Sequence, residues 1–593
     1  MRVRTPAGAA PVRRRRTAAV IAALLGLAGV AGCASVPSSG PVMYRVANAD
    51  DDDAVGLVPP GPVDDADPES LVSAFLLASG SGAAAPNQFE TAKLYLTGDA
   101  AGQWAPTGDV VVYEGSPTVT QSVEGPGRVR VSILVDAVAR VDAHGAYAEA
   151  SQASPYTTSF ELVQGDDEQW RIDELDDGVI VREGQFADQF RATPLYFPSA
   201  DQRSWVPDQR WFPRSSWRTN AVDEVLDGPS EWLLGAVGEG PAPEGTELAV
   251  PTVTADGDGA YQVSLGPEIA GLTEARLALL YAQLAATLSD GGVEPEIALY
   301  SEDGLLTEPP QSQQPSLPAT LGSPVALAED GELYSVSDGE LTDFQRTVHL
   351  QDLTPTAIAL GPGASPVVVL DGDERIVRVA DVPSESGQQE LLRGDELVAP
   401  SVDPHGFVWS SADPGRDIAA DEAGELLVAH ESGTTLELGA PWLEGRGVVG
   451  VRVAPDGTRV AIVTEAAGGT RVHVAAVVRD ENHVPQELTK GIEVAASVSG
   501  VVVAQWSGQT SLLLLAEDGD GTTSMHQTGV GGLPDDSGST AAVQELYDVD
   551  AVTAGVADSG ALALTSAGEL YEEHPTGWGE PIAEKIDAIG YPG

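Results

Sequence analysis

The chain has 593 residues, of which 90 are acidic and 31 basic, so its formal net charge is −59. A chain of this length exceeds one hydrophobic core, which predicts several domains. Such an acidic surface excludes nucleic acid and anionic headgroups as partners, because both attract clustered Lys and Arg. The single cysteine cannot form a disulfide within the chain.

The first 32 residues have the pattern of an export signal. Four arginines at residues 13–16 precede an uncharged apolar stretch over residues 18–32. This stretch is shorter than the about 20 apolar residues of a spanning helix, and it ends in small residues rather than in a charged stop. We therefore predict a signal peptide over residues 1–32. The arginine run leaves the export route open between the general secretory and twin-arginine systems.

The cysteine follows this stretch directly, in the sequence Val-Ala-Gly-Cys of residues 30–33. This tetrad resembles the bacterial lipobox, in which a dedicated peptidase cuts before the cysteine and the thiol receives diacylglycerol. The resemblance implies cleavage between Gly32 and Cys33, and lipidation of Cys33 by diacylglycerol and palmitate. Two acyl chains hold a protein stably on a membrane, where one chain is marginal. We expect a lipid-anchored protein on the extracytoplasmic face of the cell membrane; the alternative is an ordinary secretory signal with an incidental cysteine.

An acidic, Pro-rich tether is predicted over residues 33–66, because this stretch lacks apolar periodicity. Residues 67–190 then show two helical patterns followed by strand patterns. Helices followed by a curved antiparallel sheet resemble the NTF2-like α+β domains of exported proteins. The expected helices lie at residues 71–77 and 89–96, and the expected strands lie at residues 128–135, 158–163 and 169–175.

Residues 191–306 show a different pattern, in which predicted helices and predicted strands alternate along the chain. The sequences EVLDGPSEWLLGAV and LLYAQLAATL resemble the GerMN domain of bacterial envelope and sporulation proteins, which implies an α/β fold. Thr273 is the expected N-cap of the clearest helix. The expected helices lie at residues 218–226, 231–237 and 274–288, and the expected strands lie at residues 193–197, 246–253, 261–265 and 296–300.

A Pro- and Gln-rich linker is predicted over residues 307–321, and residues 322–593 consist of short strand pairs around Gly-containing turns. Six such units begin near residues 323, 364, 399, 449, 499 and 553. Intervals of about 35 to 54 residues suit four-stranded propeller blades. The sequence thus predicts an all-β propeller of six or seven blades. A β-sandwich is the alternative, although it rarely reaches about 270 residues as one domain.

The order of these parts resembles one family over the whole chain after the signal peptide. A lipobox, the sequence CASVPSSGP, an NTF2-like unit, a GerMN unit, a propeller and a final IGYPG are similar to the LpqB family of actinobacterial lipoproteins. The resemblance implies a partnership with the extracytoplasmic domain of a sensor histidine kinase of the MtrA/MtrB two-component system. It also implies an influence on cell-envelope and division programmes. It transfers no binding residue other than Cys33.

Common motifs for catalysis and metal binding are absent from the sequence. The eight histidines have no zinc-finger spacing, and no HExxH, GxSxG or Ser-x-x-Lys motif occurs. Acidic turns at residues 256–259, 371–373 and 518–521 lack the ligand set of an EF-hand loop and are interpreted as hairpin turns. Trp409 and Trp506 are expected in the blade core. We therefore predict no catalytic residue, metal site or cofactor.

Two functions remain open from the sequence. The first is a membrane-anchored accessory or modulator of the kinase, with cell-wall material as a further expected partner and no nucleic acid. The second is an envelope enzyme, a hydrolase or lactonase-like propeller acting on a cell-wall component, because propeller channels host catalysis as well as binding. Buried carboxylates and histidines with shifted pKa values at one mouth of the propeller would favour the enzyme.

Overall fold

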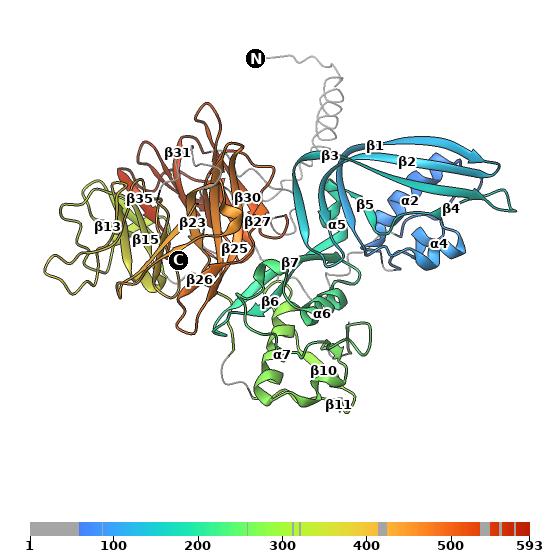
Figure 1. Ribbon diagram of the computed structural model, residues 1–593, viewed down its shortest axis with the longest axis horizontal. Coiled ribbons are helices and arrows are strands. Elements are labelled where there is room, and N and C mark those ends of the chain that lie inside the picture. Colours follow the sequence, from blue (N-terminus) through green and yellow to red (C-terminus); the bar gives the residue numbers. More distant parts are fainter. Residues whose placement is uncertain are drawn as a thin grey trace, which may run out of the picture. The chain divides into compact units, whose positions relative to one another are not determined.

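The computed structural model describes residues 58–85, 87–257, 259–310, 314–318, 322–412, 424–533, 546–556, 560–574 and 577–592. Figure 1 shows the succession of elements along this part of the chain, which is multidomain and mainly β, as the sequence predicts. The predicted signal peptide and most of the predicted tether lie outside the described residues.

The N-terminal domain is built on a sheet of five strands with the order β4-β3-β2-β1-β5. Strands β1 and β5 pair in parallel, and the other neighbours are antiparallel. Strand β2 alternates buried and exposed side chains, because successive residues of a strand point to opposite faces. The strands are β1 (Val110–Gly125), β2 (Arg128–Val141), β3 (Tyr147–Gln164), β4 (Trp170–Glu174) and β5 (Val179–Arg182).

Helix α2 (Pro68–Gly82) packs against this sheet (Figure 1). The Asp67 carboxylate caps its N-terminus by accepting a hydrogen bond from the Ser70 amide at 3.0 Å. Leu71 and Phe75 lie one turn apart on its buried face, and burying each contributes about 1.5–3 kcal/mol. The domain also contains α3 (Glu90–Lys93), α4 (Gly98–Gln103) and α5 (Glu183–Gln189).

The strands predicted at residues 158–163 and 169–175 are confirmed and form a hairpin, with Gln164 paired to Trp170 across the turn. The predicted helix at residues 89–96 is wrong beyond the single turn of α3. Backbone hydrogen bonds explain the difference, because the Ile172 amide donates to the Tyr95 carbonyl at 3.0 Å. The Thr97 amide donates in turn to the Ile172 carbonyl at 2.8 Å, so the chain leaves the helix and joins the edge of the sheet.

The middle domain combines a hairpin, two helices and a small sheet with the order β11-β10-β9-β8. The predicted helix after Thr273 is confirmed, and the Thr273 side chain accepts a hydrogen bond from the Arg276 amide at 3.3 Å. The elements are β6 (Phe190–Pro198), β7 (Trp205–Pro213), α6 (Trp217–Asp227), η1 (Glu231–Leu233), β8 (Thr254–Ala255), β9 (Tyr261–Ser264), η2 (Pro267–Gly271), α7 (Glu274–Thr287), β10 (Ile297–Ser301) and β11 (Gly304–Leu305).

Two expectations for the middle domain fail, and one strand of it was not predicted. The predicted helix at residues 231–237 shrinks to the turn η1, and the predicted strand at residues 246–253 forms one isolated bridge, from Leu248 to Leu265. Strand β7 was not predicted, because its sequence Trp-Val-Pro-Asp-Gln-Arg-Trp does not alternate apolar and polar residues. All nine of its residues are buried.

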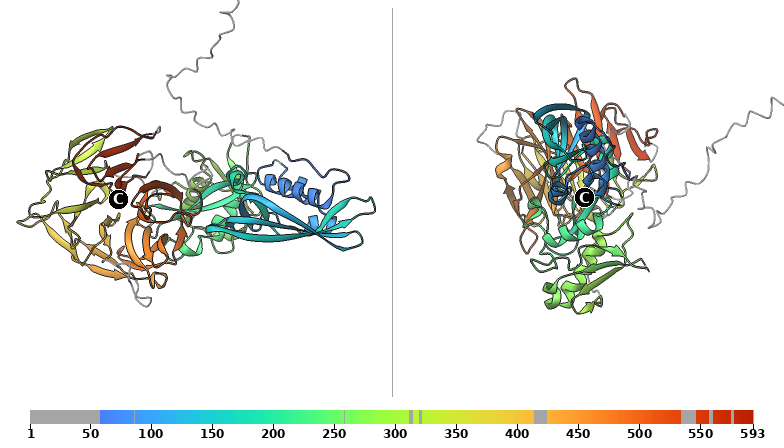
Figure 2. Two further views of the ribbon diagram at one scale, coloured as in Figure 1. Left: turned by 90° about the horizontal axis from the view of Figure 1, so that it is seen from above. Right: turned by 90° about the vertical axis from the view of Figure 1, so that its right-hand side faces the viewer.

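The propeller consists of six sheets within the described residues (Figure 2). The first sheet contains β12 (Val325–Ala328), β13 (Leu333–Ser337), β14 (Glu340–Asp343) and β35 (Ile586–Gly590). The second sheet contains β15 (Pro355–Leu360), β16 (Val367–Asp371), β17 (Arg375–Arg378) and β18 (Gln389–Arg393). The third sheet contains β19 (Ser401–Val402), β20 (Phe407–Ser410), β21 (Leu426–His430) and β22 (Thr435–Leu438). The fourth sheet contains β23 (Gly447–Val453), β24 (Arg459–Ala466), β25 (Gly469–Arg479), β26 (Pro485–Leu488) and β27 (Ile492–Val494). The fifth sheet contains β28 (Val501–Trp506), β29 (Ser511–Glu517) and β30 (Thr523–Gly529). The sixth sheet contains β31 (Val549–Thr553), β32 (Leu562–Thr565), β33 (Leu570–His574) and β34 (Gly577–Trp578). The turns η3 (Pro362–Ala364) and η4 (Pro441–Leu443) lie between strands.

The ring is closed by the two ends of the propeller sequence. Strand β35 pairs antiparallel with β12, so the first sheet contains three strands from the start and one from the end. Each of the six sequence repeats falls in a different sheet, which confirms the predicted propeller and gives six blades among the described residues. Such closure leaves only the short outer strands of the blades as sheet edges.

The middle domain shares an apolar core with the propeller. Val206 of β7 and Leu233 of η1 are fully buried in one cluster with residues of β24, β25, β28 and β29, including Val474 and Leu514. Thr489 Oγ1 of the propeller donates a hydrogen bond to the Trp232 carbonyl at 2.6 Å. The interface therefore has an apolar core, and a cavity of about 750 Å³ lies beside it.

The N-terminal domain also reaches the propeller through strand β7. Trp211 is 1% exposed and belongs to the core of the N-terminal domain together with Leu533. Its indole Nε1 donates a hydrogen bond to the Gly531 carbonyl at 3.0 Å. Gln209 Nε2 donates to the Leu533 carbonyl at 3.4 Å. Strand β7 thus contacts both other domains.

We expect residues 322–593 to fold alone as an all-β unit, because the ring closes on itself and each blade packs against its neighbours. The measurement is far-ultraviolet circular dichroism of the isolated fragment. Limited proteolysis of the full chain should cut within residues 307–321. A helical spectrum, or cuts throughout the fragment, would contradict the expectation. Residues such as Val474 lose the cover of the middle domain, so the fragment should self-associate more than the full chain does.

Candidate functional site

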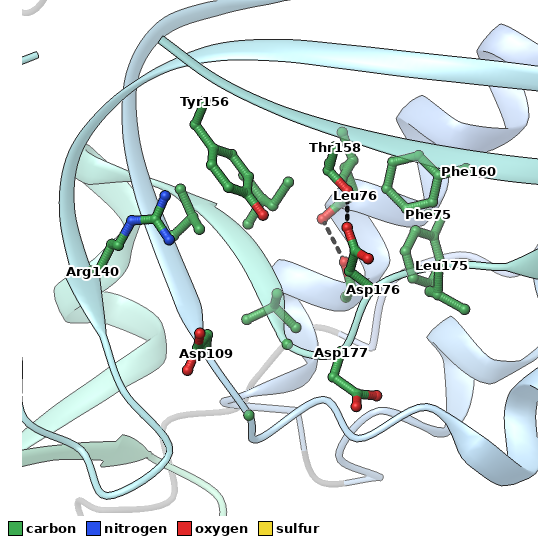
Figure 3. Close-up of a pocket in the computed structure, with 16 residues that line it drawn as sticks. Phe75, Leu76, Asp109, Arg140, Tyr156, Thr158, Phe160, Leu175, Asp176 and Asp177 are labelled. Carbon is green, nitrogen blue, oxygen red and sulfur yellow. Dashed lines mark hydrogen bonds between the residues drawn. The ribbon is translucent and has the colours of Figure 1, made fainter. Parts of the chain in front are cut away.

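The predicted lipidation site, Cys33, and the cleavage position Gly32–Cys33 lie outside the described residues. Both therefore stay predictions. Among the described residues, none of the helices has the length and apolar character needed to cross a membrane. The structure instead offers a candidate binding site in the N-terminal domain, a cavity of about 460 Å³ between helix α2 and the sheet (Figure 3). Its volume lies within the usual range of small-molecule pockets, about 300–1,000 Å³.

One side of this cavity is apolar. Phe75 and Leu76 come from α2, Phe160 comes from β3, and Leu175 follows β4. The rings of Phe75 and Phe160 lie with their centroids 5.8 Å apart in an edge-to-face arrangement, which holds both rings in place. This side can bury an apolar group of a ligand, gaining about 25 cal/mol for each Å² of apolar surface removed from water.

The lining also contains charged and polar residues, as Figure 3 shows: Asp109, Asp176, Asp177, Arg140 and Tyr156. The Arg140 guanidinium lies 4.8 Å from the centroid of the Tyr156 ring, close enough for a cation–π interaction. Burial, reinforced by the negative charge of Asp176, raises the pKa of the Tyr156 hydroxyl. The phenol is therefore protonated at neutral pH and is available as a hydrogen-bond donor.

Hydrogen bonds hold two of these carboxylates in place. Thr158 Oγ1 donates to Asp176 Oδ2 at 2.8 Å, and the Ala105 amide donates to Asp177 Oδ1 at 2.8 Å. Three carboxylates and one guanidinium give the opening a net negative charge, which favours a ligand with a cationic group near its polar end. Among the described residues that line the cavity there is no His, Cys or Lys. The arrangement suits binding of an amphipathic ligand.

The propeller axis offers much less space. A cavity of about 60 Å³ lies among the inner strands β15, β19, β23, β28, β31 and β35. This volume is far below that of a ligand pocket. Trp409 and Trp506 are 0% and 4% exposed, which confirms them as blade core. Their indole Nε1 groups donate hydrogen bonds inside the propeller, Trp409 to Asp403 Oδ2 at 3.0 Å and Trp506 to the Arg452 carbonyl at 3.0 Å.

Two propeller histidines have strongly shifted pKa values. Burial lowers the pKa of His473 to about 4, and burial together with the nearby Arg479 cation lowers that of His405 to about 4. Both rings are therefore neutral at pH 7. His473 stacks on Trp442, with ring centroids 5.1 Å apart, and lies 3.4 Å from Thr464 Oγ1. Neither contact supplies the carboxylate partner of a general base, so His473 is part of the blade core.

In two of the acidic turns, internal contacts engage the carboxylates. Asp518 Oδ1 accepts a hydrogen bond from the Thr522 amide at 3.0 Å. Asp371 Oδ1 accepts one from the Thr354 amide at 2.7 Å, and Asp371 Oδ2 is paired with Arg375. These contacts agree with the interpretation as turn residues.

Comparison with known proteins covers most of the chain. The family model of the lipoprotein LpqB N-terminal domain matches residues 61–187, and that of the lipoprotein LpqB beta-propeller domain matches residues 331–584. The chain belongs to the LpqB family. Lipoprotein LpqB of Thermobifida fusca is 29% identical over 565 residues, which cover 85% of this chain and 88% of the relative. Lipoprotein LpqB of Streptomyces avermitilis is 28% identical over 566 residues, which cover 87% and 89%.

The N-terminal LpqB match includes every strand of the sheet that lines the cavity, and the propeller match spans parts of all six blades. A solved structure of a prolyl endopeptidase is 14% identical, covers 45% of this chain and 48% of that chain, and has a TM-score of 0.28. A similarity this low carries no information about activity. The LpqB relatives are named as lipoproteins, in agreement with the lipobox predicted at residues 30–33.

Proposed function

We propose that the protein is a lipid-anchored accessory of a sensor histidine kinase, held by Cys33 on the extracytoplasmic face of the cell membrane. The expected kinase is of the MtrB type, and the expected outputs are cell-envelope and division programmes controlled through MtrA. This partnership rests on the LpqB family resemblance. In this proposal the protein binds its partner and consumes no substrate, and cell-wall material is a further candidate ligand.

The observation that best supports the proposal is the joining of a ligand cavity to a propeller through buried contacts. Phe75 and Phe160 of the cavity wall belong to the same core cluster as Trp211, which contacts the propeller. One protein can therefore offer a small-molecule site and a broad surface for a second protein. The net charge of −59 favours encounter with a basic partner surface, and this attraction weakens as salt is raised.

Weak affinity is sufficient for such an accessory. Two proteins confined to the same membrane meet at a high effective concentration, so that a contact of micromolar strength in solution can be largely occupied in the cell. The tether predicted over residues 33–66 provides the reach from the bilayer to the kinase. The acidic residues of the tether repel one another and keep it extended.

The test is kinase-dependent transcription in a deletion strain that carries one of three forms of the protein. We expect the full-length protein to restore the output, and both the Cys33→Ala form and a form truncated after residue 320 to fail. Immunoblotting controls for the amount of each form, because truncation exposes the apolar interface around Leu233. Equal restoration by all three forms would remove the basis of the proposal, since neither anchoring nor the propeller would then matter to signalling.

A further inference from the structure

Three side chains of metal-binding type meet where the loop between β6 and β7 approaches two loops of the propeller. Asp201 lies in the β6–β7 loop, His405 lies in the β19–β20 turn, and His483 lies in the β25–β26 turn. The carboxylate of Asp201 and the imidazoles of His405 and His483 each offer one ligand atom, and these atoms all lie within 4.8 Å of one another. All three residues are half-buried.

The two histidine loops are held in place by their own hydrogen bonds. Asp403 Oδ1 accepts a hydrogen bond from the His405 amide at 2.9 Å. The His483 amide donates to the Asp480 carbonyl at 2.9 Å, and His483 adopts a left-handed backbone with φ of 63°. The left-handed region is uncommon for a non-glycine residue, although histidine occurs in it more often than most.

The two imidazoles face each other without other partners. Their rings stack with centroids 4.5 Å apart and an angle of 16° between the planes. Within the described parts of the chain, the ring nitrogens of His405 and His483 make no hydrogen bond. The ring nitrogens of both histidines are therefore available to a ligand at this position.

The carboxylate of Asp201 is oriented by its own loop. Asp201 Oδ1 accepts hydrogen bonds from Ser199 Oγ at 2.6 Å and from the Arg203 amide at 3.1 Å. Asp201 Oδ2 lies 3.7 Å from the guanidinium of Arg203, whose side chain is 71% exposed. One oxygen thus fixes the orientation of the side chain, and the other is available for a cation.

Two imidazoles and one carboxylate are the ligands of a borderline divalent ion such as Zn²⁺. In a tetrahedral zinc site, bonds of about 2.0–2.1 Å place the ligand atoms about 3.4 Å apart. Separations of at most 4.8 Å exceed this value by up to about 1.4 Å, so the three side chains must rotate toward one another to bind one ion. The nearby Arg479 does not prevent cation binding, because its Nη2 is paired with the buried Asp403 carboxylate at 2.7 Å.

A second cluster, formed by His144, Glu224 and Asp227, satisfies the same distance criterion but is already occupied. His144 Nδ1 lies 3.2 Å from both carboxylate oxygens of Glu224. Glu224 also pairs with the buried Arg210 guanidinium at 2.8 Å, which places a fixed positive charge beside the cluster. A cation would have to compete with both partners of Glu224. This cluster is therefore the control against which zinc binding by Asp201, His405 and His483 is tested.

We propose that Asp201, His405 and His483 form a zinc site that links the middle domain to the propeller. Three protein ligands leave a fourth position of the tetrahedral ion for water or for a group from a partner. Because the ligands come from two domains, bound zinc stabilises their contact by mass action. This site is independent of the proposed kinase partnership and of the cavity in the N-terminal domain.

The test is isothermal titration of the full-length lipoprotein, purified in detergent and stripped with a chelator, with ZnCl₂ in the presence of excess CaCl₂. Calcium occupies sites made only of surface carboxylates, which are numerous in this acidic protein. We expect one Zn²⁺ per chain. Mutating a residue that only hydrogen-bonds to a metal ligand lowers metal affinity by about 10- to 100-fold. Loss of a ligand itself should cost at least as much, so His405→Gln and His483→Gln should each weaken zinc binding by about 100-fold or more.

His144→Gln is the matched control, because it removes a histidine of the second cluster and should leave zinc affinity unchanged. Thermal unfolding of each chelated variant must match that of the chelated wild type, which separates loss of a ligand from loss of the fold. Zinc should raise the unfolding temperature of the wild type and of His144→Gln only. Absence of calcium-resistant binding by the wild type would overturn the proposal. Unchanged binding by the His405 and His483 variants would overturn it equally.

Discussion

Replacing Cys33 by alanine is expected to abolish lipidation completely. The thiol is the atom that carries the diacylglycerol, and alanine offers no nucleophile for that transfer. The chain contains no other cysteine to substitute for it. Acyl chains contribute about 0.8 kcal/mol for each buried CH₂ group, so their loss removes the main membrane attachment. The acidic body provides no electrostatic replacement, because attraction to anionic lipid needs clustered Lys and Arg.

Metabolic labelling with a fatty acid, followed by fractionation, measures this effect. We expect label on the wild-type protein, no label on Cys33→Ala, and a shift of Cys33→Ala from the membrane to the soluble fraction after export. Mass spectrometry of the N-terminal peptide shows whether the signal sequence is still attached. Ser38→Ala is the control, since it alters a neighbouring polar residue outside the lipobox and should remain fully acylated. A labelled, membrane-bound Cys33→Ala protein would refute the anchor assignment.

The propeller could be predicted from the sequence, with six or seven blades, because all blades but the first are encoded locally. Every repeat contains two strand patterns joined by a short turn, as in the β23–β24 turn at Asp456 and Gly457. The Asp456 side chain accepts a hydrogen bond from the Thr458 amide at 2.7 Å. A turn of this kind depends on neighbours in the sequence. Helix α7 could be predicted for the same reason, from its cap at Thr273 and its apolar periodicity.

Strand β7 could not be predicted, because its burial depends on distant partners. Asp208 and Arg210 are charged, so the sequence alone predicts that both lie on the surface. In the structure they are 2% and 4% exposed. Their burial requires Glu224 from the following helix and the backbone of residue 144 from another domain. A single sequence gives no sign of such pairing. Apolar periodicity therefore misses a buried strand whose polar residues are satisfied by non-local contacts.

The cavity in the N-terminal domain and the Asp201, His405 and His483 cluster could not be predicted either, because both depend on non-local contacts. Arg140 and Tyr156 meet in the cavity through the register of β2 and β3, which is set by the whole sheet. Asp201, His405 and His483 lie in three loops from two domains, so they have no spacing motif. The histidines were interpreted as scattered because only short-range spacing can be read along a chain. Sites assembled across domains become visible only when the fold brings their loops together.

Arg210 is expected to be the most important single charge for the stability of the middle domain. Its side chain is 5% exposed and is paired with Asp208 at 2.9 Å and with Glu224 at 2.8 Å. It also donates to the carbonyl of His144 at 3.0 Å and to that of Gly228 at 3.4 Å. The two carboxylates raise the pKa of Arg210 further, so the guanidinium stays charged throughout.

Arg210→Met should lower the free energy of unfolding by about 3–5 kcal/mol, because it leaves two carboxylates in a buried site without their cation. Methionine keeps much of the apolar stem, so the loss reports mainly the missing charge and hydrogen bonds. Arg210→Lys should cost less, since an ammonium restores the charge but not the fork that reaches both carboxylates. Urea unfolding followed by tryptophan fluorescence measures the change, with Trp211 adjacent in sequence and buried.

Arg203→Met is the matched control in the same hairpin. Its side chain is 71% exposed and its nearest carboxylate oxygen lies 3.7 Å away, so its loss should change stability by no more than about 0.5 kcal/mol. A cost for Arg210→Met near that of the control would mean that water replaces the guanidinium, and that the junction between the N-terminal and middle domains is open to solvent. A large cost for Arg210→Met alone would show that the buried pairing holds strand β7 between its two neighbours.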